Sequence, residues 1–301
     1  MNSHVKGTKY TIDKNIIRNE KYEELVQLAT FLLTDGGMSK DKKTYVIYFT
    51  NKSKELHRQF KLIVQELIPE VLFRTSTYKG VHRTYFNSIE LAELLFELSN
   101  SYRTAPCESY PVCVLLRGNA EMRPCSVCIK RYDDKNKVFP DATLPIVDDD
   151  VLQREILRTI ADTEGGTSFL IGRKPTYIRL KREVFIACNH PTLREQIMEM
   201  LFDQGILSRY HSGSVTIEGH AVNEFNEKIG FSKGVKVSKG HYKGYDKQSV
   251  LEVMVLTNQL IKDKRIYPGN IKNLEEVLRR SIEIYDQTYS RMKVIDFLMN
   301  C

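Results

Sequence analysis

The sequence predicts an α+β protein built from two similar lobes and a C-terminal helical extension, and three observations support this. Two apolar, helix-forming stretches, residues 28–36 and 157–165, each end in one carboxylate that is followed by two glycines. After each stretch the same order of elements follows: strands, a helix, strands and a closing helix. Beyond residue 244 the apolar spacing is helical. A repeat of this kind predicts two lobes related by a pseudo-twofold axis.

The first half of the chain contains each element of this order. The segment 44–49 is rich in β-branched and aromatic residues, which is typical of a strand. Apolar residues at helical spacing follow over 56–67. A hairpin over 72–86, turning at Lys79-Gly80, comes next, and an amphipathic helix over 89–98 closes the unit.

The second half repeats the order. A strand at 183–187, a helix at 193–201, a hairpin at 208–217 and a closing helix from Val222 to Gly230 are predicted. The stretch between the halves is interrupted by prolines but keeps its aliphatic content, which favours a structured linker. The predicted domains are a first lobe at 1–104, a linker at 105–150, a second lobe at 151–244 and a helical extension at 245–301.

Charge and hydropathy narrow the class of protein. The chain of 301 residues carries a net charge of +7, and its basic residues cluster at 40–54, 173–182 and 228–247. Such clusters fit contacts with phosphate better than a uniform solubility charge does, although a solvated face is the alternative. No apolar run reaches the roughly 18 residues of a membrane span, so no membrane partner is expected. The polar N-terminus lacks a signal-peptide core, which predicts a cytoplasmic protein.

Basic and aromatic side chains are predicted to line one face of each sheet. In the strand before Ala187, alternation places Tyr177, Arg179 and Lys181 on one face and Ile178 and Leu180 on the other. A twisted cationic sheet of this width fits the major groove of DNA, whereas an ordinary half-buried sheet is the alternative. The candidate nucleic-acid-binding residues are Lys43, Lys52, Arg74, Lys79, Arg83, Arg173, Tyr177, Arg179, Lys181 and Arg209.

Four of the six cysteines allow a competing interpretation, in which they form a zinc site. Cys125 and Cys128 form a CxxC pair, and Cys107 and Cys113 precede them. These four are candidate Zn²⁺ ligands of an interaction module, but their irregular spacing is more typical of ordinary thiols in a reducing compartment.

The two acidic helices resemble the signature of LAGLIDADG homing endonucleases, in the monomeric form that carries two motifs in one chain. The second copy, Leu157-Arg158-Thr159-Ile160-Ala161-Asp162-Thr163-Glu164-Gly165, is similar to an archaeal and intein variant of that motif, as its Arg158 and the later Phe169 indicate. The resemblance covers about 25–240 and implies αββαββα lobes with saddle-shaped antiparallel sheets.

The resemblance also implies which residues carry the chemistry. The last acid of each motif, Asp35 and Glu164, would bind Mg²⁺ or another divalent cation such as Mn²⁺, together with Gly36 and Gly165. Hard carboxylate oxygens suit Mg²⁺, which activates water and stabilises the leaving oxygen in phosphodiester hydrolysis. A basic residue after each closing helix would act on the phosphate, and the matching residues are Lys236 and Arg103.

The resemblance therefore implies a site-specific endonuclease that cuts both strands of DNA, with one metal-binding acid from each lobe. Its expected partner is double-stranded DNA with a long, nearly asymmetric target, and we expect a monomer. The alternative is a descendant that binds nucleic acid without cutting it, such as an intron maturase that binds RNA or a DNA-binding regulator. The absence of flanking splicing residues predicts a freestanding or intron-encoded protein.

Overall fold

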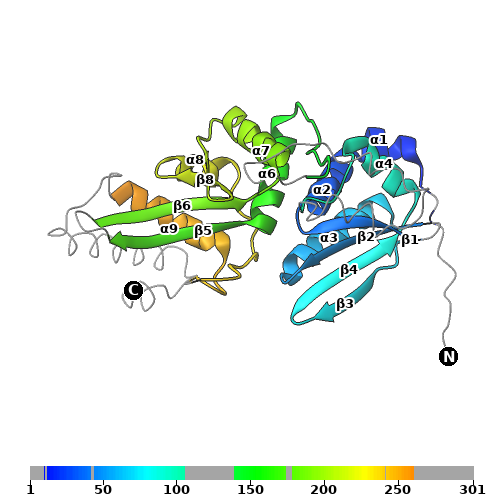
Figure 1. Ribbon diagram of the computed structural model, residues 1–301, viewed down its shortest axis with the longest axis horizontal. Helices are drawn as coiled ribbons and strands as arrows, with labels where there is room; N and C mark the ends of the chain where they lie inside the picture. Colours follow the sequence, from blue (N-terminus) through cyan, green and yellow to red (C-terminus); the bar gives the residue numbers. More distant parts are fainter. Residues whose placement is uncertain are drawn as a thin grey trace. The chain divides into compact units, whose positions relative to one another are not determined.

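The structure, a computed structural model, describes residues 10, 12–41, 44–105, 139–173, 178–240 and 242–260 (Figure 1). The chain divides into two compact units, residues 1–163 with 188–197 and residues 164–187 with 198–301. The first unit thus includes nearly all of the second motif helix, so the repeat and the compact units have different boundaries. In the part of the chain that the structure describes, no helix has the length and apolar character needed to cross a membrane.

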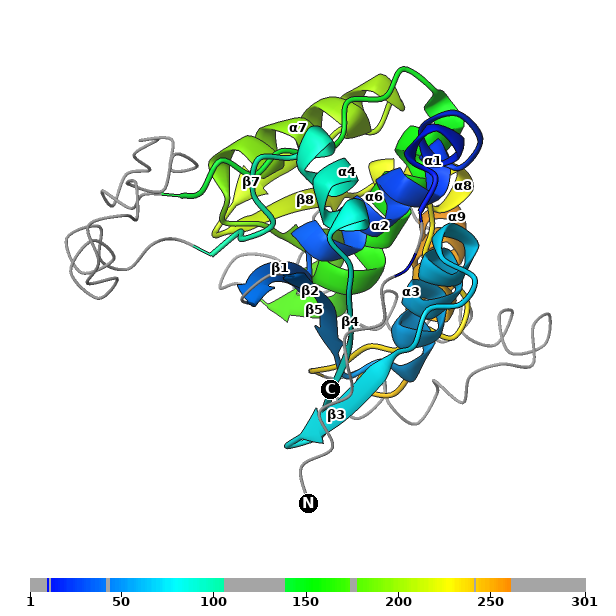
Figure 2. The same ribbon diagram turned by 90° about the vertical axis from the view of Figure 1, so that its right-hand side faces the viewer.

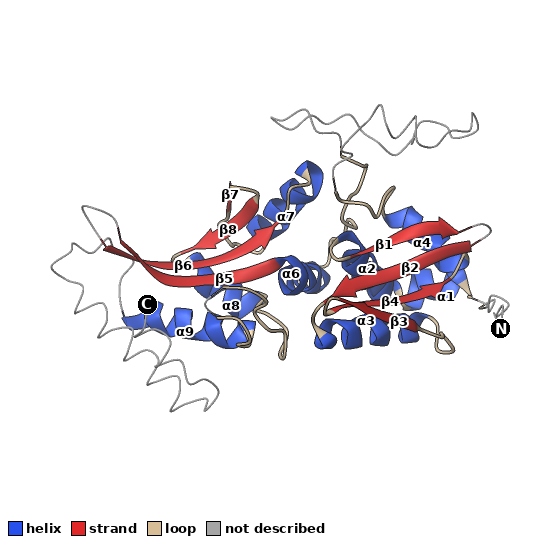
Figure 3. Ribbon diagram, turned by 60° about the horizontal axis from the view of Figure 1, so that its bottom comes forward, coloured by secondary structure: helices blue, strands red, loops and turns tan. Residues whose placement is uncertain are grey.

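The first lobe has the predicted order of elements. Its four strands form an antiparallel sheet in the order β1-β2-β4-β3, so β3 lies at an edge. Figure 3 shows the helices of this lobe on one side of the sheet. The elements are α1 (Lys14–Glu20), α2 (Tyr22–Leu33), β1 (Gly36–Asp41), β2 (Thr44–Asn51), α3 (Lys54–Leu67), β3 (Arg74–Tyr78), β4 (Val81–Asn87) and α4 (Glu90–Leu98).

Four phenylalanines form the core between the helices and this sheet. Phe31 of α2, Phe49 of β2, Phe60 of α3 and Phe86 of β4 are all buried. The Phe49 ring stacks on Phe60 at 5.3 Å between centroids and meets Phe31 edge-on at 5.2 Å. Aromatic pairs at these separations stabilise a core beyond the area they bury, so this cluster holds the end of α2 against the sheet.

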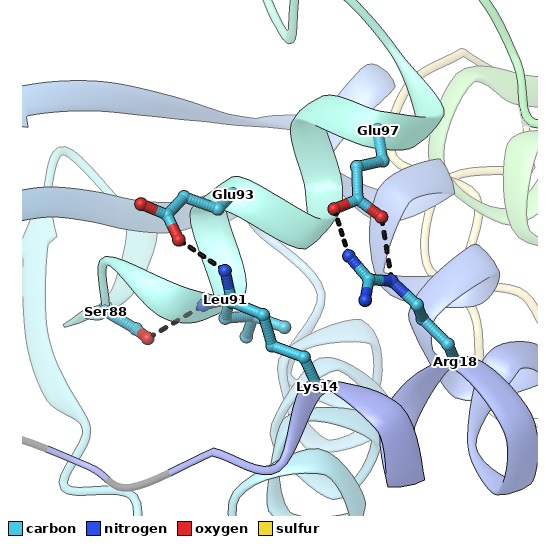
Figure 4. Close-up of polar contacts among 6 residues, drawn as sticks. All are labelled: Lys14, Arg18, Ser88, Leu91, Glu93 and Glu97. Carbon is cyan, nitrogen blue, oxygen red and sulfur yellow. Dashed lines mark hydrogen bonds and ion pairs between the residues drawn. The ribbon is translucent and has the colours of Figure 1, made fainter.

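Helix α1 precedes the repeat and is tied to α4 (Figure 4). Arg18 donates two hydrogen bonds to the Glu97 carboxylate, and Lys14 forms an ion pair with Glu93. The hydrogen bonds from Arg18 hold the pKa of Glu97 below its ordinary value. Such exposed pairs contribute little to stability, so buried Ile17 and the contact with α2 must hold α1 in place.

The second lobe repeats the topology with the sheet order β5-β6-β8-β7, again antiparallel throughout. The predicted α+β fold of two αββαββα lobes is therefore confirmed. Helix α9, beyond the repeat, packs on α8 and on β5, as expected of a brace on the second lobe. The elements are α6 (Asp150–Glu164), β5 (Gly165–Arg173), β6 (Ile178–Ala187), α7 (Pro191–Asp203), β7 (Arg209–His211), β8 (Ser214–Glu218), α8 (Ala221–Lys228) and α9 (Lys247–Leu260).

Two details of the strands differ from the sequence prediction. Strand β3 begins at Arg74 and not at Leu72, whose backbone N–H donates to the Tyr10 hydroxyl. In β6, Arg182 is only 2% exposed although it belongs to the basic cluster at 173–182. Its position in the strand puts it on the face of Val184, and its guanidinium donates to Asn258 of α9. Arg182 is therefore part of the core and does not contribute a surface charge.

Candidate functional site

Both motif helices end in the same way. Thr34, which follows α2, donates its hydroxyl hydrogen bond to the carbonyls of Thr30 and Phe31, at 3.2 and 3.0 Å. Thr163 in α6 does the same to Thr159 and Ile160, at 2.8 and 3.1 Å. In α2 these carbonyls belong to the last turn, whose carbonyls lack partners within the helix. Each threonine stands immediately before the motif acid, so the two halves present their acids from equivalent helix ends.

Asp35 lies between α2 and β1 and is half-buried. Its backbone carbonyl accepts the N–H of Thr50 at 2.9 Å, which ties the helix end to β2. Its carboxylate Oδ2 accepts a hydrogen bond from the Asn51 side-chain amide at 2.5 Å. Residues of β2 therefore hold both the backbone and the carboxylate of Asp35.

Asn51, the last residue of β2, is a functional candidate that the sequence prediction missed. Besides Asp35, its side chain contacts the Ser53 N–H, which donates to Oδ1 at 2.7 Å. Its backbone carbonyl lies 3.1 Å from His57 Nε2, and since a carbonyl only accepts, that nitrogen carries the proton. Asn51 thus links Asp35 to the start of α3. Its place at the end of a strand was evident in the sequence, but its pairing with Asp35 depends on the strand register.

Glu164 is the last residue of α6 and is also half-buried. The carbonyl oxygen of Gly165, the next residue, accepts a hydrogen bond from Lys247 Nζ at 2.6 Å. Lys247 is only 4% exposed and its ammonium lies 5.4 Å from the centre of the Phe231 ring. A buried cation therefore contacts the residue that follows the second motif acid.

The predicted basic residues Lys236 and Arg103 occupy different surroundings from Lys247. Both are exposed, and Lys236 pairs through its backbone with Asp246. Lys247 itself lies in the basic cluster at 228–247, but nothing in the sequence separates it from its neighbours there.

One face of the first sheet, which we call the outer face, carries the basic and aromatic side chains of β2, β3 and β4. Register pairs Arg74 with Tyr85 and Ser76 with Arg83, so both arginines lie on the face away from buried Thr84 and Phe86. The Arg83 guanidinium lies over the Tyr48 ring at 4.3 Å and near Tyr85 at 5.6 Å. Among the described residues neither arginine forms an ion pair, so both charges are open to an anionic partner.

In the second sheet, two of the candidate cations are paired with carboxylates. Glu183 and Glu218 stand opposite each other in the β6–β8 register. Lys181 forms an ion pair with Glu183 at 2.5 Å, and Arg209 pairs with Glu218. Two of the candidate nucleic-acid contacts are therefore already neutralised by carboxylates of the same sheet.

The structure gives less detail on the surroundings of the remaining candidate nucleic-acid-binding residues. Lys52 is exposed just after β2, and Lys79 lies at the β3–β4 turn with a positive φ of 48°. The backbone register pairs Arg173 with Ile178 and Arg179 with Gly172. Lys43, Tyr177 and the four cysteines of the possible Zn²⁺ site (Cys107, Cys113, Cys125 and Cys128) lie outside the described residues.

The carboxylate oxygens of Asp35 and of Glu164, each acid taken by itself, are hard donors of the kind that Mg²⁺ prefers. Within the described ranges, no three His, Cys, Asp or Glu side chains gather as a ligand cluster. Mg²⁺ does not need one, because it keeps several waters and binds through one or two carboxylates together with substrate phosphate. The carbonyl of Gly165 already accepts from Lys247, so the carboxylates are the stronger donors here.

Comparisons with known proteins give one family match and several similar solved structures. Residues 23–99 match the LAGLIDADG-like domain family. No curated protein matches the chain. Among solved structures, the chain is similar to I-DmoI in complex with DNA and Mn, at 12% identity over 69% of this chain and 96% of that one, with a TM-score of 0.40. The meganuclease I-AabMI bound to uncleaved DNA matches at 9% identity over 84% and 97%, with a TM-score of 0.45.

The family match falls on the first lobe, from α2 to the C-terminus of α4. The second lobe repeats the same order of helices and strands and the same sheet topology. The match to the LAGLIDADG-like domain family therefore covers the first lobe, and the second lobe shares the topology of that matched lobe.

Proposed function

We propose that this protein is a metal-dependent endonuclease that cuts double-stranded DNA at a long, nearly asymmetric site. The observation that carries the proposal is the equivalent presentation of two acids, Asp35 after Thr34 and Glu164 after Thr163. A protein that only binds nucleic acid has no need of two carboxylates at matched helix ends, because carboxylates repel phosphate. The open arginines on the outer face of the first sheet add a surface for the DNA backbone.

In this proposal Asp35 and Glu164 hold Mg²⁺ or Mn²⁺. A bound ion of this kind activates a water and neutralises charge on the phosphate. Asn51 keeps the Asp35 carboxylate in one orientation, and Lys247 supplies positive charge beside the second acid. Arg74 and Arg83 bind DNA phosphates and set the position of the duplex on the first lobe.

A descendant that binds DNA or RNA without cutting it is the second candidate function. The observation that favours it is that Lys181 and Arg209, two of the candidate DNA contacts on the second sheet, are already paired with Glu183 and Glu218. An enzyme that cuts both strands needs contacts from both lobes, whereas a binding protein can rely on one. Tight, salt-dependent binding with no metal-dependent product would support this candidate.

Selection of cleaved sites from a random double-stranded DNA library, with Mg²⁺ present, tests the proposal. We expect the wild-type protein to enrich one long sequence and the variants Asp35→Asn and Glu164→Gln to enrich none. If wild-type protein yields the same products as both variants, the chain is not an endonuclease of this kind.

We expect the removal of cations from the first sheet to weaken DNA binding more than the removal of cations from the second sheet. The double variant Arg74→Gln/Arg83→Gln is expected to reduce the slope of log Kd against log salt by about two, because two phosphate contacts are lost. The matched double variant Lys181→Gln/Arg209→Gln is expected to leave that slope near its wild-type value, because each cation is already paired. Equal changes in the two slopes, measured by fluorescence anisotropy, would contradict this.

Removal of Asn51 is expected to slow cleavage without weakening DNA binding. Asn51→Ala deletes the hydrogen bond that orients the Asp35 carboxylate, and a loss of orientation at a reacting centre costs on the order of 10²-fold in rate. Single-turnover cleavage rates and the Kd for DNA, measured side by side, check this. Asn51→Asp is the informative companion variant, because it keeps the size but places a second carboxylate against Asp35. We expect Asn51→Asp to cleave DNA more slowly than Asn51→Ala at low Mg²⁺, and its cleavage rate to recover partly as the Mg²⁺ concentration rises.

A matched pair of variants distinguishes Lys247 from Lys236, the lysine that the family resemblance assigns to the phosphate. We expect Lys247→Met to lower the cleavage rate by more than tenfold, since its ammonium contacts the residue after Glu164. Lys236→Met should have the smaller effect, because Lys236 is exposed. Melting temperatures must be compared first, and a larger loss for Lys236→Met at unchanged stability would reverse the assignment.

A further inference from the structure

A pocket of about 360 Å³ opens between α3 and the hairpin of β3 and β4 in the first lobe. These three elements are labelled in Figure 2. It lies on the helix side of the sheet, since Thr75 and Thr77 pair in register with Thr84 and His82 and share the face of buried Thr84. Arg74 and Arg83 occupy the opposite, outer face. The pocket is therefore separate from the surface proposed above for DNA.

The lining of this pocket is cationic. Lys54, Arg58 and Lys61 project from α3, and no carboxylate contributes to the lining. Arg58 is paired with Glu55, at 2.9 Å from Nε and 2.6 Å from Nη2. Lys54 and Lys61 form no ion pair among the described residues. Two ammonium groups thus share one concave surface without a counter-charge, which is an arrangement that an anion stabilises.

The remaining polar groups of the lining are those that bind phosphate oxygens. Four hydroxyl-bearing residues of β3 and β4 contribute, and hydroxyls donate readily to such oxygens. His82 Nδ1 lies 2.9 Å from the Thr77 hydroxyl. The pocket volume falls within the roughly 300–1,000 Å³ of small-ligand sites and exceeds what a lone ion requires.

His57 lines the pocket and is buried. Its Nε2 donates to the Asn51 carbonyl, and its Nδ1 lies 2.8 Å from the Thr84 hydroxyl. Burial lowers the pKa of His57, and the nearby His82 and Lys61 lower it further. An anion in the pocket would offset the repulsion from Lys61, so the His57 ring is a built-in reporter of occupancy.

We propose that this pocket binds a phosphate group, carried either by a free mononucleotide or by a nucleic-acid chain, with Lys54 and Lys61 as its principal ligands. The site is distinct from the proposed endonuclease site, because its lining contains neither motif acid and neither outer-face arginine. Of its strand residues only Ser76 lies on the outer face by register. Failure of one proposal therefore leaves the other standing.

Titration of the full-length protein with inorganic phosphate, followed through the histidine ring signals by NMR, tests the proposal. We expect the His57 and His82 signals to shift with a saturable curve, and chloride at equal ionic strength to leave them unchanged. Because charge-assisted hydrogen bonds are lost, Lys54→Gln/Lys61→Gln should weaken the phosphate Kd at least tenfold. The control double variant Lys233→Gln/Lys239→Gln removes the same charge from exposed sites of the other unit and should leave the Kd unchanged.

Two further titrations distinguish the sources of the phosphate group. One uses a 5′-mononucleotide, and the other uses a dinucleotide that has only an internal phosphodiester. Tighter binding of the first indicates a free phosphate monoester, and tighter binding of the second indicates a nucleic-acid chain. Equal shifts with chloride would overturn the proposal, as would an unchanged phosphate Kd in Lys54→Gln/Lys61→Gln. Asp35→Asn should bind phosphate like the wild type, which separates this site from the metal site.

Discussion

Asp35→Asn is expected to abolish DNA cleavage while leaving the protein folded and able to bind DNA. The amide is nearly isosteric with the carboxylate, but it lacks the charge that holds a divalent cation. Loss of metal activation removes several kcal/mol of transition-state stabilisation, so we expect a fall in rate on the order of 10³-fold. The side chain of Asn51 can still bond to the amide oxygen, which should keep the helix end in place.

The measurement is the single-turnover cleavage rate on the selected site, with a Mg²⁺ titration for each protein. Glu164→Gln tests the second acid in the same way, and Glu70→Gln is the control because Glu70 is an exposed acid on the first lobe. DNA affinity in Ca²⁺ or without metal should be equal or slightly higher in Asp35→Asn, since a negative charge near phosphate is removed. Full cleavage by Asp35→Asn would exclude Asp35 as a metal ligand.

Gly36→Ala is expected to destabilise the first lobe by about 1–3 kcal/mol, the usual range for inserting a methyl group into a packed site. A Cβ at Gly36 would lie 2.8 Å from the Leu32 Cα, 2.8 Å from the Tyr48 carbonyl oxygen and 2.9 Å from the Phe31 carbonyl oxygen. All three are backbone atoms, so no side-chain rotation relieves the contact. The helix end and β1 must move apart, and this displaces Asp35, which lies between them.

Gly37→Ala is the matched control for this prediction. Its nearest contact would be the Tyr48 hydroxyl, at 2.7 Å, which is the far end of a side chain and is able to move. We therefore expect a smaller loss in the free energy of unfolding, measured by urea denaturation, and a cleavage rate closer to wild type. Equal losses in the two variants would indicate that the close approach at Gly36 is not what requires glycine there.

Much of the fold was predictable because the motif occurs twice. Acid-Gly-Gly after an apolar helix has little meaning alone, but two copies followed by the same order of elements predict two equivalent lobes. Residue types also predicted the strands and helices, since alternation and helical spacing follow from local geometry. The start of β3 was misplaced by two residues, because Leu72 has the β propensity of a strand but its N–H bonds to Tyr10.

The candidate site was only partly predictable. Asp35 and Glu164 were identified because the repeat marks them, and their roles remain a proposal. Asn51 was missed because its contact with Asp35 spans the helix-to-strand junction and depends on the pairing of β1 with β2. Lys247 was missed because its neighbours in the basic cluster look the same in the sequence, and only the packing of α9 on β5 buries it.

The sequence by itself determined the repeat, the order of elements in each lobe and the position of the two acids at helix ends. These follow from local periodicity and from similar residues at equivalent places in the two copies. The tertiary structure alone decided which charges are free. Arg74 and Arg83 remain open, Lys181 and Arg209 are paired, and Arg182 is buried. The reason is physical: the free energy of a charge depends on the solvent and counter-charges around it, and these come from residues distant in the chain.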